Sequence, residues 1–185
     1  MKRFTLFLAL LGLIGSGSAH AQNFKAEQML IVYYSHSGNT KAAAEIIQKE
    51  TGAEMFELKT QKAYPEDYQE LLKVAKSEID TKKYPALQAM PKNLEKYDVI
   101  LVGTPNWYST MAPAVSEFLA KANIGDQIVV PFVTHGSGGM ANCETDMQAA
   151  CPSAKFLKGI AMNGSNAKNA TVSIQKWLKE IGMAK

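Results

Sequence analysis

The stretch MLIVYYSHSGNTKAAAEII, residues 29–47, decides how this chain folds. It begins as an apolar strand, breaks into small polar residues, and continues directly as an amphipathic helical pattern. A loop that enters a helix N-terminus offers free backbone N–H groups and the positive end of the helix dipole, and both favour an anion. The glycine in the break lets the backbone fold tightly. The sequence therefore predicts a phosphate-binding loop made of Ser35, His36, Ser37, Gly38, Asn39 and Thr40.

This loop lacks the features of two better-known phosphate motifs. It has no lysine, which the GxxxxGK[ST] loop requires, and it does not match the GxGxxG pattern of dinucleotide-binding loops. Neutral hydroxyl, amide and backbone donors must therefore hold the phosphate. The alternative interpretation is an ordinary turn in which a Ser or Thr side chain caps the helix.

Strand and helix patterns alternate along the rest of the chain. Strands are expected at residues 29–35, 53–59, 98–104, 127–135 and 154–163, and helices at 41–52, 65–80, 112–123, 142–150 and 169–182. Most of the strands are apolar without polar alternation, so both faces of the sheet need cover. The pattern predicts an α/β fold with a parallel sheet and helices on each side.

Two helices carry apolar stripes that should face the core. The helix at 65–80 is expected to start at Pro65, which suits a first helical turn. Its stripe is Tyr68, Leu71, Leu72, Ala75 and Ile79. The stripe of the closing helix is Val172, Ile174, Trp177, Leu178 and Ile181.

The first 21 residues have the pattern of a secretory signal peptide. Lys2 and Arg3 precede an apolar run, and AHA at residues 19–21 suits cleavage after Ala21. We expect export to a bacterial periplasm and a single mature domain at residues 22–185. Cleavage lowers the formal charge from +3 to +1, which gives no argument for nucleic acid or a membrane surface as partner. No later segment is apolar and long enough to span a bilayer.

Two cysteines, Cys143 and Cys151, stand in a chain that export would expose to oxidation. A helix between them would separate them by about 12 Å along its axis. A disulfide needs Cα atoms within about 7 Å. We therefore expect two free thiols.

Two further strand ends are polar, and both contain glycine. GTPNWYST follows the strand at 98–104 and exposes Trp107, on which a flat heterocycle could stack. THGSGG follows the strand at 127–135 and brings backbone groups close to a ligand edge. Ligands of parallel sheets bind outside the carboxyl ends of strands, where these loops should meet. The candidate residues are Thr104, Pro105, Asn106, Trp107 and Tyr108, with Thr134, His135, Gly136, Ser137 and Gly138. The alternatives are an aromatic packed on the next helix and a plain flexible turn.

Together these loops resemble those of flavodoxins. The [ST]-x-[ST]-G-x-T pattern matches residues 35–40, and G-x-P-x-W matches residues 103–107. The resemblance covers nearly all of residues 29–182 and implies a five-stranded sheet of order 2-1-3-4-5 with FMN as cofactor. It implies that residues 35–40 hold the FMN phosphate, that residues 104–108 flank the flavin with Trp107 stacked on it, and that residues 134–138 line its pyrimidine edge.

The chain departs from the flavodoxin pattern in several places. Its last loop has no tyrosine to stack on the second flavin face, and its near-neutral mature charge lacks the acidity that steers flavodoxins to basic partners. Tyr108-Ser109-Thr110 also lacks the glycine whose peptide turns over when the flavin gains one electron. Because Ser109 should turn only at a steric cost, we expect two-electron chemistry to be favoured over one-electron chemistry.

The first functional interpretation is an FMN-dependent redox protein of the cell envelope, either an electron carrier or a small reductase linked to NAD(P)H or a quinone. Its partner would be a redox protein or a small-molecule electron donor or acceptor. The alternative is a flavodoxin-fold module that binds another phosphorylated ligand without redox activity. A serine hydrolase is disfavoured because the chain has no GxSxG elbow. No catalytic residue and no metal ligand are assigned.

Overall fold

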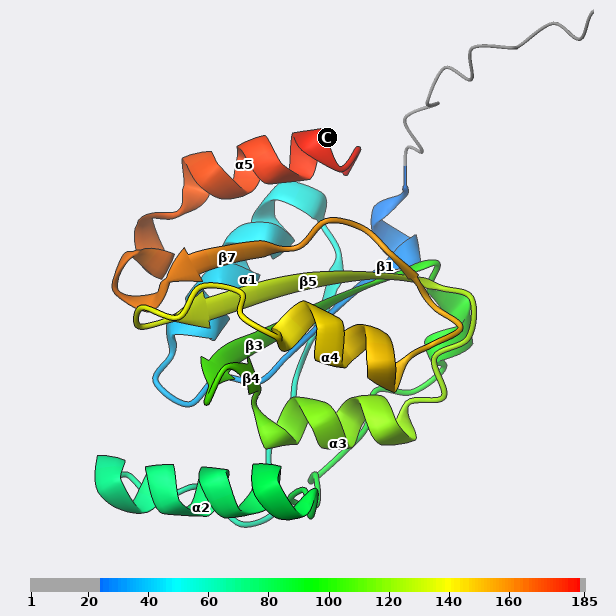
Figure 1. The fold of residues 1–185 in the computed structure, drawn as a ribbon. Helices are drawn as coiled ribbons and strands as arrows, with labels where there is room; N and C mark the ends of the chain where they lie inside the picture. Colours follow the sequence, from blue (N-terminus) through cyan, green and yellow to red (C-terminus); the bar gives the residue numbers. More distant parts are fainter. Residues whose placement is uncertain (1–23, 184–185) are drawn as a thin grey trace, which may run out of the picture.

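The computed structural model describes residues 24–183, and its centre is a parallel β-sheet. The strands are β1 (Met29–Tyr33), β2 (Glu54–Glu57), β3 (Val99–Trp107), β5 (Ile128–His135), β6 (Lys155–Phe156) and β7 (Ile160–Asn163). Their order is β2-β1-β3-β5-β6, with β7 also paired to β5. A short strand, β4 (Thr110–Met111), pairs antiparallel with the end of β3. The predicted parallel sheet and its order are confirmed, and β6 and β7 share the place of the fifth strand (Figure 1).

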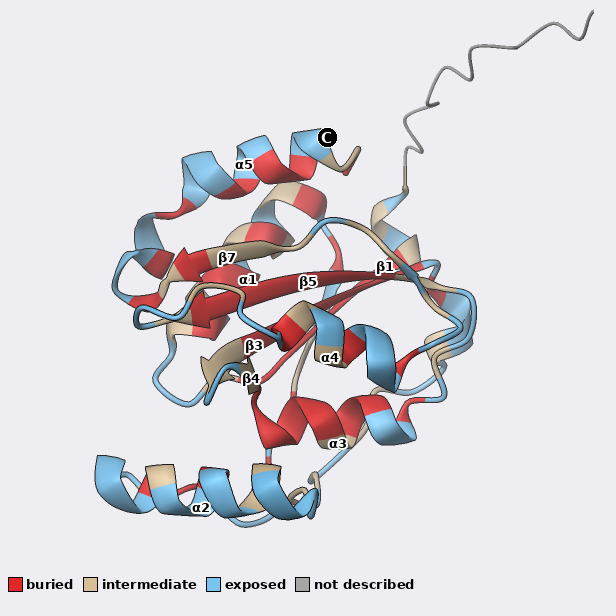
Figure 2. Cartoon of the chain, in the orientation of Figure 1, coloured by how far each residue is buried: buried red, intermediate tan, exposed pale blue. Residues whose placement is uncertain are grey.

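Helices cover both faces of the sheet, as the apolar strands require (Figure 1). The helices are α1 (Asn39–Thr51) and α5 (Thr171–Glu180) on one side, and α2 (Tyr68–Thr81), α3 (Pro113–Lys121) and α4 (Cys143–Ala150) on the other. Short 3₁₀ helices lie at η1 (Ala26–Gln28), η2 (Leu94–Lys96) and η3 (Gly164–Asn169). The central strands are buried on both faces, so the chain has one apolar core on each side of the sheet (Figure 2).

Gly103 of β3 pairs with Phe132 of β5, the next strand in the sheet. Phe132 is fully buried, and a Cβ at position 103 would lie 2.1 Å from Cζ of its ring. Tyr33, the last residue of β1, pairs with Gly103 on the other side. Only glycine fits here, and this row of residues lies at the carboxyl edge of the sheet, where the ligand loops begin.

The single strand expected at residues 154–163 is instead divided into β6 and β7. The pairing register along β5 shifts by one residue between them. The intervening residues 157–159 lie opposite Pro131 of β5, which has no N–H to donate to a ladder. Gly159 packs so closely that a Cβ there would lie 2.9 Å from the Pro131 carbonyl oxygen. The division is therefore a β-bulge that forms beside a proline.

Helix α2 differs from its prediction in both its start and its burial. It begins at Tyr68 rather than Pro65, because the Asp67 side chain accepts a hydrogen bond from a backbone N–H of the first turn at 2.9 Å. Of the expected stripe, only Leu71 and Ala75 are buried. The helix packs beside α3 rather than flat on the sheet, and most of its surface is exposed (Figures 1 and 2).

In α5 the predicted stripe is largely confirmed, since Ile174, Trp177 and Leu178 are buried. Val172 was predicted wrongly and is 77% exposed. It stands two positions before Ile174, which rotates its side chain by about 200° around the helix and points it to solvent.

The expected signal peptide, residues 1–21, lies outside the described residues. Between residues 24 and 183, no helix has both the length and the hydropathy needed to cross a bilayer.

Both cysteines are buried free thiols, as predicted. Cys143 begins α4, and Cys151 follows its last residue. Burial raises the pKa of the Cys143 thiol to about 12, with a further contribution from the charge of Asp146, and raises the pKa of Cys151 to about 11. Both thiols therefore stay protonated at neutral pH.

Thiol titration tests this arrangement. We expect two thiols per chain in denatured, non-reduced protein. In the native protein at about pH 8, both should react far more slowly than in the denatured chain, because the thiolate is the reactive form. A denatured count of zero would contradict the structure, and equally fast reaction in both states would show that α4 opens.

Candidate functional site

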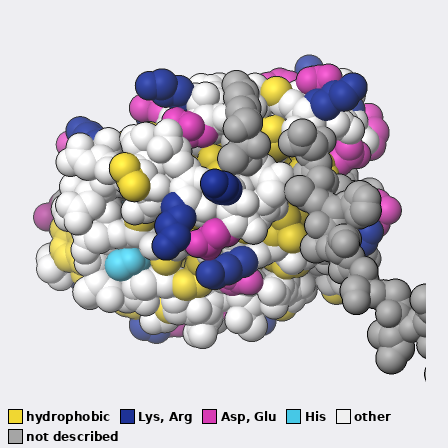
Figure 3. All heavy atoms as spheres, turned by 90° about the horizontal axis from the view of Figure 1, so that it is seen from above, with side chains coloured by type: hydrophobic (Ala, Val, Ile, Leu, Met, Phe, Trp, Pro, Cys, Tyr) yellow, Lys and Arg dark blue, Asp and Glu magenta, His cyan; other side chains and the backbone are white. Residues whose placement is uncertain are grey.

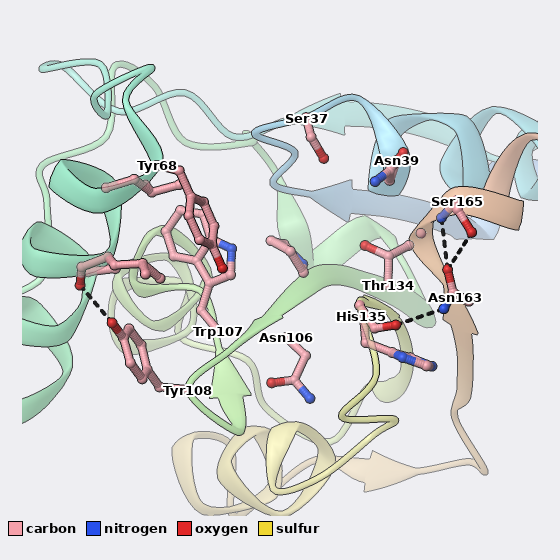
Figure 4. A pocket seen from close by; sticks show the side chains of 16 residues that line it. Ser37, Asn39, Tyr68, Asn106, Trp107, Tyr108, Thr134, His135, Asn163 and Ser165 are labelled. Carbon is pink, nitrogen blue, oxygen red and sulfur yellow. Dashed lines mark hydrogen bonds between the residues drawn. The ribbon is translucent and has the colours of Figure 1, made fainter.

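One cavity lies at the carboxyl edge of the sheet, where β1, β3, β5 and β7 end (Figure 4). Its volume is about 850 Å³, within the range of small-ligand sites. The three polar loops singled out in the sequence converge on it, and α2 forms one side. The lining residues are Ser37, Asn39, Tyr68, Leu71, Leu72, Ala75, Pro105, Asn106, Trp107, Tyr108, Thr134, His135, Gly136, Asn163, Gly164 and Ser165.

The loop after β1 leads into the N-terminus of α1. Gly38 occupies the N-cap position with a φ of +83°, a left-handed conformation that favours glycine. The Ser35 hydroxyl accepts a hydrogen bond from the Lys41 backbone N–H at 3.2 Å, which holds the loop against the first helical turn. Ser37 and Asn39 line the cavity beside this helix end (Figure 4). The first N–H groups of a helix have no acceptor within it, so this end of the cavity suits an anion.

A buried pair of hydroxyls joins this loop to the end of β5. Thr40 and Thr134 are almost fully buried, and their Oγ1 atoms lie 2.8 Å apart in a shared hydrogen bond. One hydroxyl hydrogen makes that bond, so the second remains available to another acceptor. Thr134 lines the cavity, whereas Thr40 is not among the lining residues.

Trp107 belongs to the opposite, aromatic end of the cavity (Figure 4). Its ring makes edge-to-face contacts with Tyr34 at 5.7 Å, Tyr64 at 5.1 Å and His36 at 6.0 Å between centroids. The Tyr64 hydroxyl donates to the Glu78 carboxylate of α2. Burial raises the pKa of both tyrosines, so they remain protonated, and it also raises the pKa of Glu78. Trp107 is therefore supported by packed rings on the protein side.

The turn after Trp107 is a tight β-hairpin that the sequence analysis did not predict. Tyr108 and Ser109 join β3 to β4 with φ of +52° and +67°, the pattern of a type I′ turn. The Tyr108 hydroxyl donates to the Leu72 carbonyl of α2 at 3.1 Å. The Asn142 N–H donates to the Ser109 carbonyl at 2.9 Å. The hairpin is thus held between α2 and the start of α4.

A fourth strand end, after β7, completes the polar side of the cavity. The Asn163 side chain donates to the Gly136 carbonyl at 2.7 Å, and its oxygen accepts hydrogen bonds from the Ser165 N–H and hydroxyl (Figure 4). Beside it, the buried Nδ1 of His135 has no hydrogen-bond partner within residues 24–183. A buried polar atom without a partner at a cavity is a candidate contact for a ligand.

The structure divides the predicted site residues into two groups. Those that line the cavity are Ser37, Asn39, Pro105, Asn106, Trp107, Tyr108, Thr134, His135 and Gly136. Those that do not line it are Ser35, His36, Gly38, Thr40, Thr104, Ser137 and Gly138. Several of the second group shape the loops, as Gly138 does by packing where a Cβ would lie 3.0 Å from the Asn106 amide nitrogen. Their contacts with a ligand stay predictions.

The sequence analysis missed two parts of the lining. Asn163, Gly164 and Ser165 follow a core strand in the same polar manner as the other three loops, and that signal was present in the sequence. The residues of α2 had no such signal, because an apolar stripe at helical spacing indicates a buried face in general. No cluster of three or more metal-binding side chains occurs in the part of the chain that the structure describes.

The fold and cavity define a doubly wound α/β protein with a ligand site at the carboxyl edge of its sheet. The chain belongs to the flavodoxin family, whose profile matches residues 28–181.

Solved structures and a curated relative agree with this assignment. A protein from Bacteroides eggerthii shares the fold, with a TM-score of 0.72 and 23% identity, covering 83% of this chain and 97% of the other. A flavoprotein from Lactobacillus acidophilus, solved in complex with FMN, has a TM-score of 0.66 and 26% identity, covering 78% of this chain and 98% of the other. An NAD(P)H dehydrogenase (quinone) of Brucella ovis is 31% identical over 136 residues, which span 65% of each chain.

Thr104 has a structural role that mutation can test. Its side chain is fully buried. The hydroxyl accepts a hydrogen bond from the Ala112 N–H at 2.9 Å and donates one to the Pro105 carbonyl at 2.9 Å. Thr104→Val leaves the Ala112 N–H unpaired, and we expect a loss of roughly 1–3 kcal/mol in the free energy of unfolding. Thr104→Ser should lose less, since it keeps the hydroxyl. Denaturant unfolding measures both, and equal losses would argue against the hydrogen bonds.

Proposed function

We propose that this protein binds FMN in the described cavity and acts as a small flavin-dependent oxidoreductase of the cell envelope. The observation that carries the proposal is a single cavity with an anion-binding helix N-terminus at one end and a supported indole at the other. FMN has the same division, with a phosphate at one end and a planar ring at the other. Bound FMN would supply the redox chemistry, and the protein would supply binding and orientation.

The residues present fit the cofactor from end to end. The α1 N-terminus, Ser37 and Asn39 would receive the phosphate, with the free hydrogen of the Thr40–Thr134 pair as a further donor. Trp107 would stack on the ring. The partnerless Nδ1 of His135 supports a polar contact with the ligand on the β5 side.

We favour a reductase with a small-molecule donor or acceptor over a pure electron carrier. The Brucella ovis relative, named for NAD(P)H and quinone, supports this choice. The face that Figure 3 shows gives no electrostatic argument for a protein partner, because Lys and acidic side chains are interspersed on it. Export to the periplasm rests on the signal-peptide pattern of residues 1–21.

Titration with FMN, followed by flavin fluorescence, tests the proposed function. We expect equimolar binding with strong quenching by Trp107. Trp107→Ala should weaken binding roughly fivefold and restore fluorescence, since an aromatic stack contributes on the order of 1 kcal/mol, whereas Trp107→Phe should lose less. Reduction by NAD(P)H with reoxidation by a quinone would then separate reductase from carrier. Binding of a different phosphorylated ligand, with no affinity for FMN, would favour the non-redox alternative.

The hydroxyl pair at the phosphate end gives a second prediction. With Thr134 donating to Thr40, the Thr40 hydroxyl in the first turn of α1 would donate the free hydrogen to the phosphate, and Thr40→Val removes that donor. We expect FMN affinity to fall about 10- to 100-fold, as for a lost hydrogen bond to a charged group. Thr40→Ser should retain most of the affinity. Riboflavin, which lacks the phosphate, should bind all three proteins equally, and a parallel loss for riboflavin would place the effect elsewhere.

The conformation of the hairpin beside Trp107 indicates which residue favours two-electron over one-electron transfer. Ser109 already has positive φ, so its side chain is not the main obstacle to turning the peptide between residues 108 and 109. Turning that peptide converts type I′ into type II′, which needs a conformation at Tyr108 that suits glycine. Tyr108, rather than Ser109, should therefore hold the peptide in one orientation and favour two-electron transfer.

Potentiometric titration of the FMN-bound protein checks this role of Tyr108. We expect one two-electron step with a slope of about 30 mV per decade. Tyr108→Gly should broaden the titration toward the roughly 59 mV per decade of one-electron steps. Tyr108→Phe removes the hydrogen bond to Leu72 but keeps the Cβ, so its titration should stay narrow. Broadening in the Phe variant would assign the effect to the hydroxyl instead.

A further inference from the structure

Two of the large apolar side chains that the structure exposes lie at the rim of the cavity. Tyr68 is 65% exposed and Tyr108 is 45% exposed, and both line the site. Exposed aromatic groups that gather at a cavity indicate a binding surface. Tyr108 is fixed through its hydroxyl, whereas no side-chain hydrogen bond to Tyr68 is found within residues 24–183.

The apolar face of α2 is turned toward this cavity. Tyr68, Leu71, Leu72 and Ala75 have the i, i+3, i+4, i+7 spacing of one helix face, and all four line the site. Only Leu71 and Ala75 are buried by protein. The face is therefore apolar but incompletely covered, and a planar apolar ligand beside it would complete the burial.

The N-terminal turn of α2 precedes the two helix positions that are hydrogen-bonded to side chains at the aromatic end of the cavity. The Tyr108 hydroxyl binds the Leu72 carbonyl, and the Tyr64 hydroxyl binds Glu78. Tyr68 precedes both contacts, and Figure 4 shows its side chain directed from α2 toward the side where Trp107 lies. The rings that contact Trp107 are those of Tyr34, His36 and Tyr64, and both Tyr68 and Trp107 line the cavity.

The loop after β5 supplies no second aromatic surface. Residues 136–142 contain no aromatic side chain, and His135 lies on the β5 side of the cavity. On Trp107's side, the rings of Tyr34, Tyr64 and His36 pack against the indole. Of the two exposed tyrosines that line the cavity, Tyr108 is held by the Leu72 carbonyl, which leaves Tyr68 to meet a ring stacked on Trp107.

We propose that α2 covers the planar ring of the bound flavin and that Tyr68 packs on the ring face turned away from Trp107. This inference rests on the proposed function and names a ring-binding residue on an element that the strand-end loops do not include. Binding would bury Tyr68 and hold the first turn of α2 closed over the ring.

Affinity for two ligands separates this role from phosphate binding. Tyr68→Ala should weaken FMN and riboflavin by the same factor, about 3- to 10-fold, because Tyr68 contacts only the ring that both ligands share. Tyr68→Phe should bind both ligands nearly as well as the unmodified protein. Val74→Ala is the matched control, since Val74 is 38% exposed on the same helix but does not line the cavity, and its affinities should be unchanged.

Limited trypsin digestion gives a readout independent of affinity. Lys73 and Lys76 lie on α2, and saturating FMN should slow cleavage there in the unmodified protein but much less in Tyr68→Ala. Unfolding of the flavin-free variant should match that of the unmodified protein, because Tyr68 is exposed. If Tyr68→Ala binds both flavins as tightly as the unmodified protein, or if Val74→Ala loses as much affinity, the role of Tyr68 is overturned. The proposed function would not be affected by either result. Failure of the unmodified protein to bind either flavin would overturn the proposed function as well.

Discussion

The contact between Gly103 and Phe132 is the constraint on which the ligand edge depends. Because position 103 has no side chain, the Phe132 ring can occupy the space above β3, and β3 and β5 pair along almost their full length. The carboxyl ends of β3 and β5, which contain Thr104 and Thr134, then lie side by side. A methyl group at position 103 would have to displace a buried ring in the middle of a close-packed core, where adjustment is small.

The cavity joins two kinds of binding surface that have different physical origins. Its polar end is built mainly from backbone groups and neutral side chains, and in the proposed function the positive end of α1 would take the place of the lysine found in other phosphate loops. Its aromatic end is built by packing, with Trp107 supported by three neighbouring rings. The polar end can be specified locally by one loop and one helix, whereas the aromatic end needs α2, β1, β3 and the segment before α2 to be in place together.

In two places the backbone conformation departs from what the local sequence favours, because residues distant in the chain pack against it. Pro131 cannot donate to the next strand, and the chain responds with a bulge between β6 and β7. Tyr108 and Ser109 adopt left-handed conformations that neither residue prefers, and contacts from α2 and the start of α4 hold them there. The hairpin is part of the cavity lining, where shape matters more than local backbone preference.

The parallel sheet, its helical layers and the convergence of the polar strand ends could be predicted from the sequence. Continuous apolar strands and the loop at residues 35–40 carry that information locally, through periodicity and turn chemistry. That Tyr68 and Leu72 border a cavity instead of the core follows from the tertiary structure alone. An apolar stripe encodes that a face avoids water, but what covers that face depends on elements far away in the chain. Because α2 packs beside α3 at the edge of the fold, part of its apolar stripe is left to line the cavity.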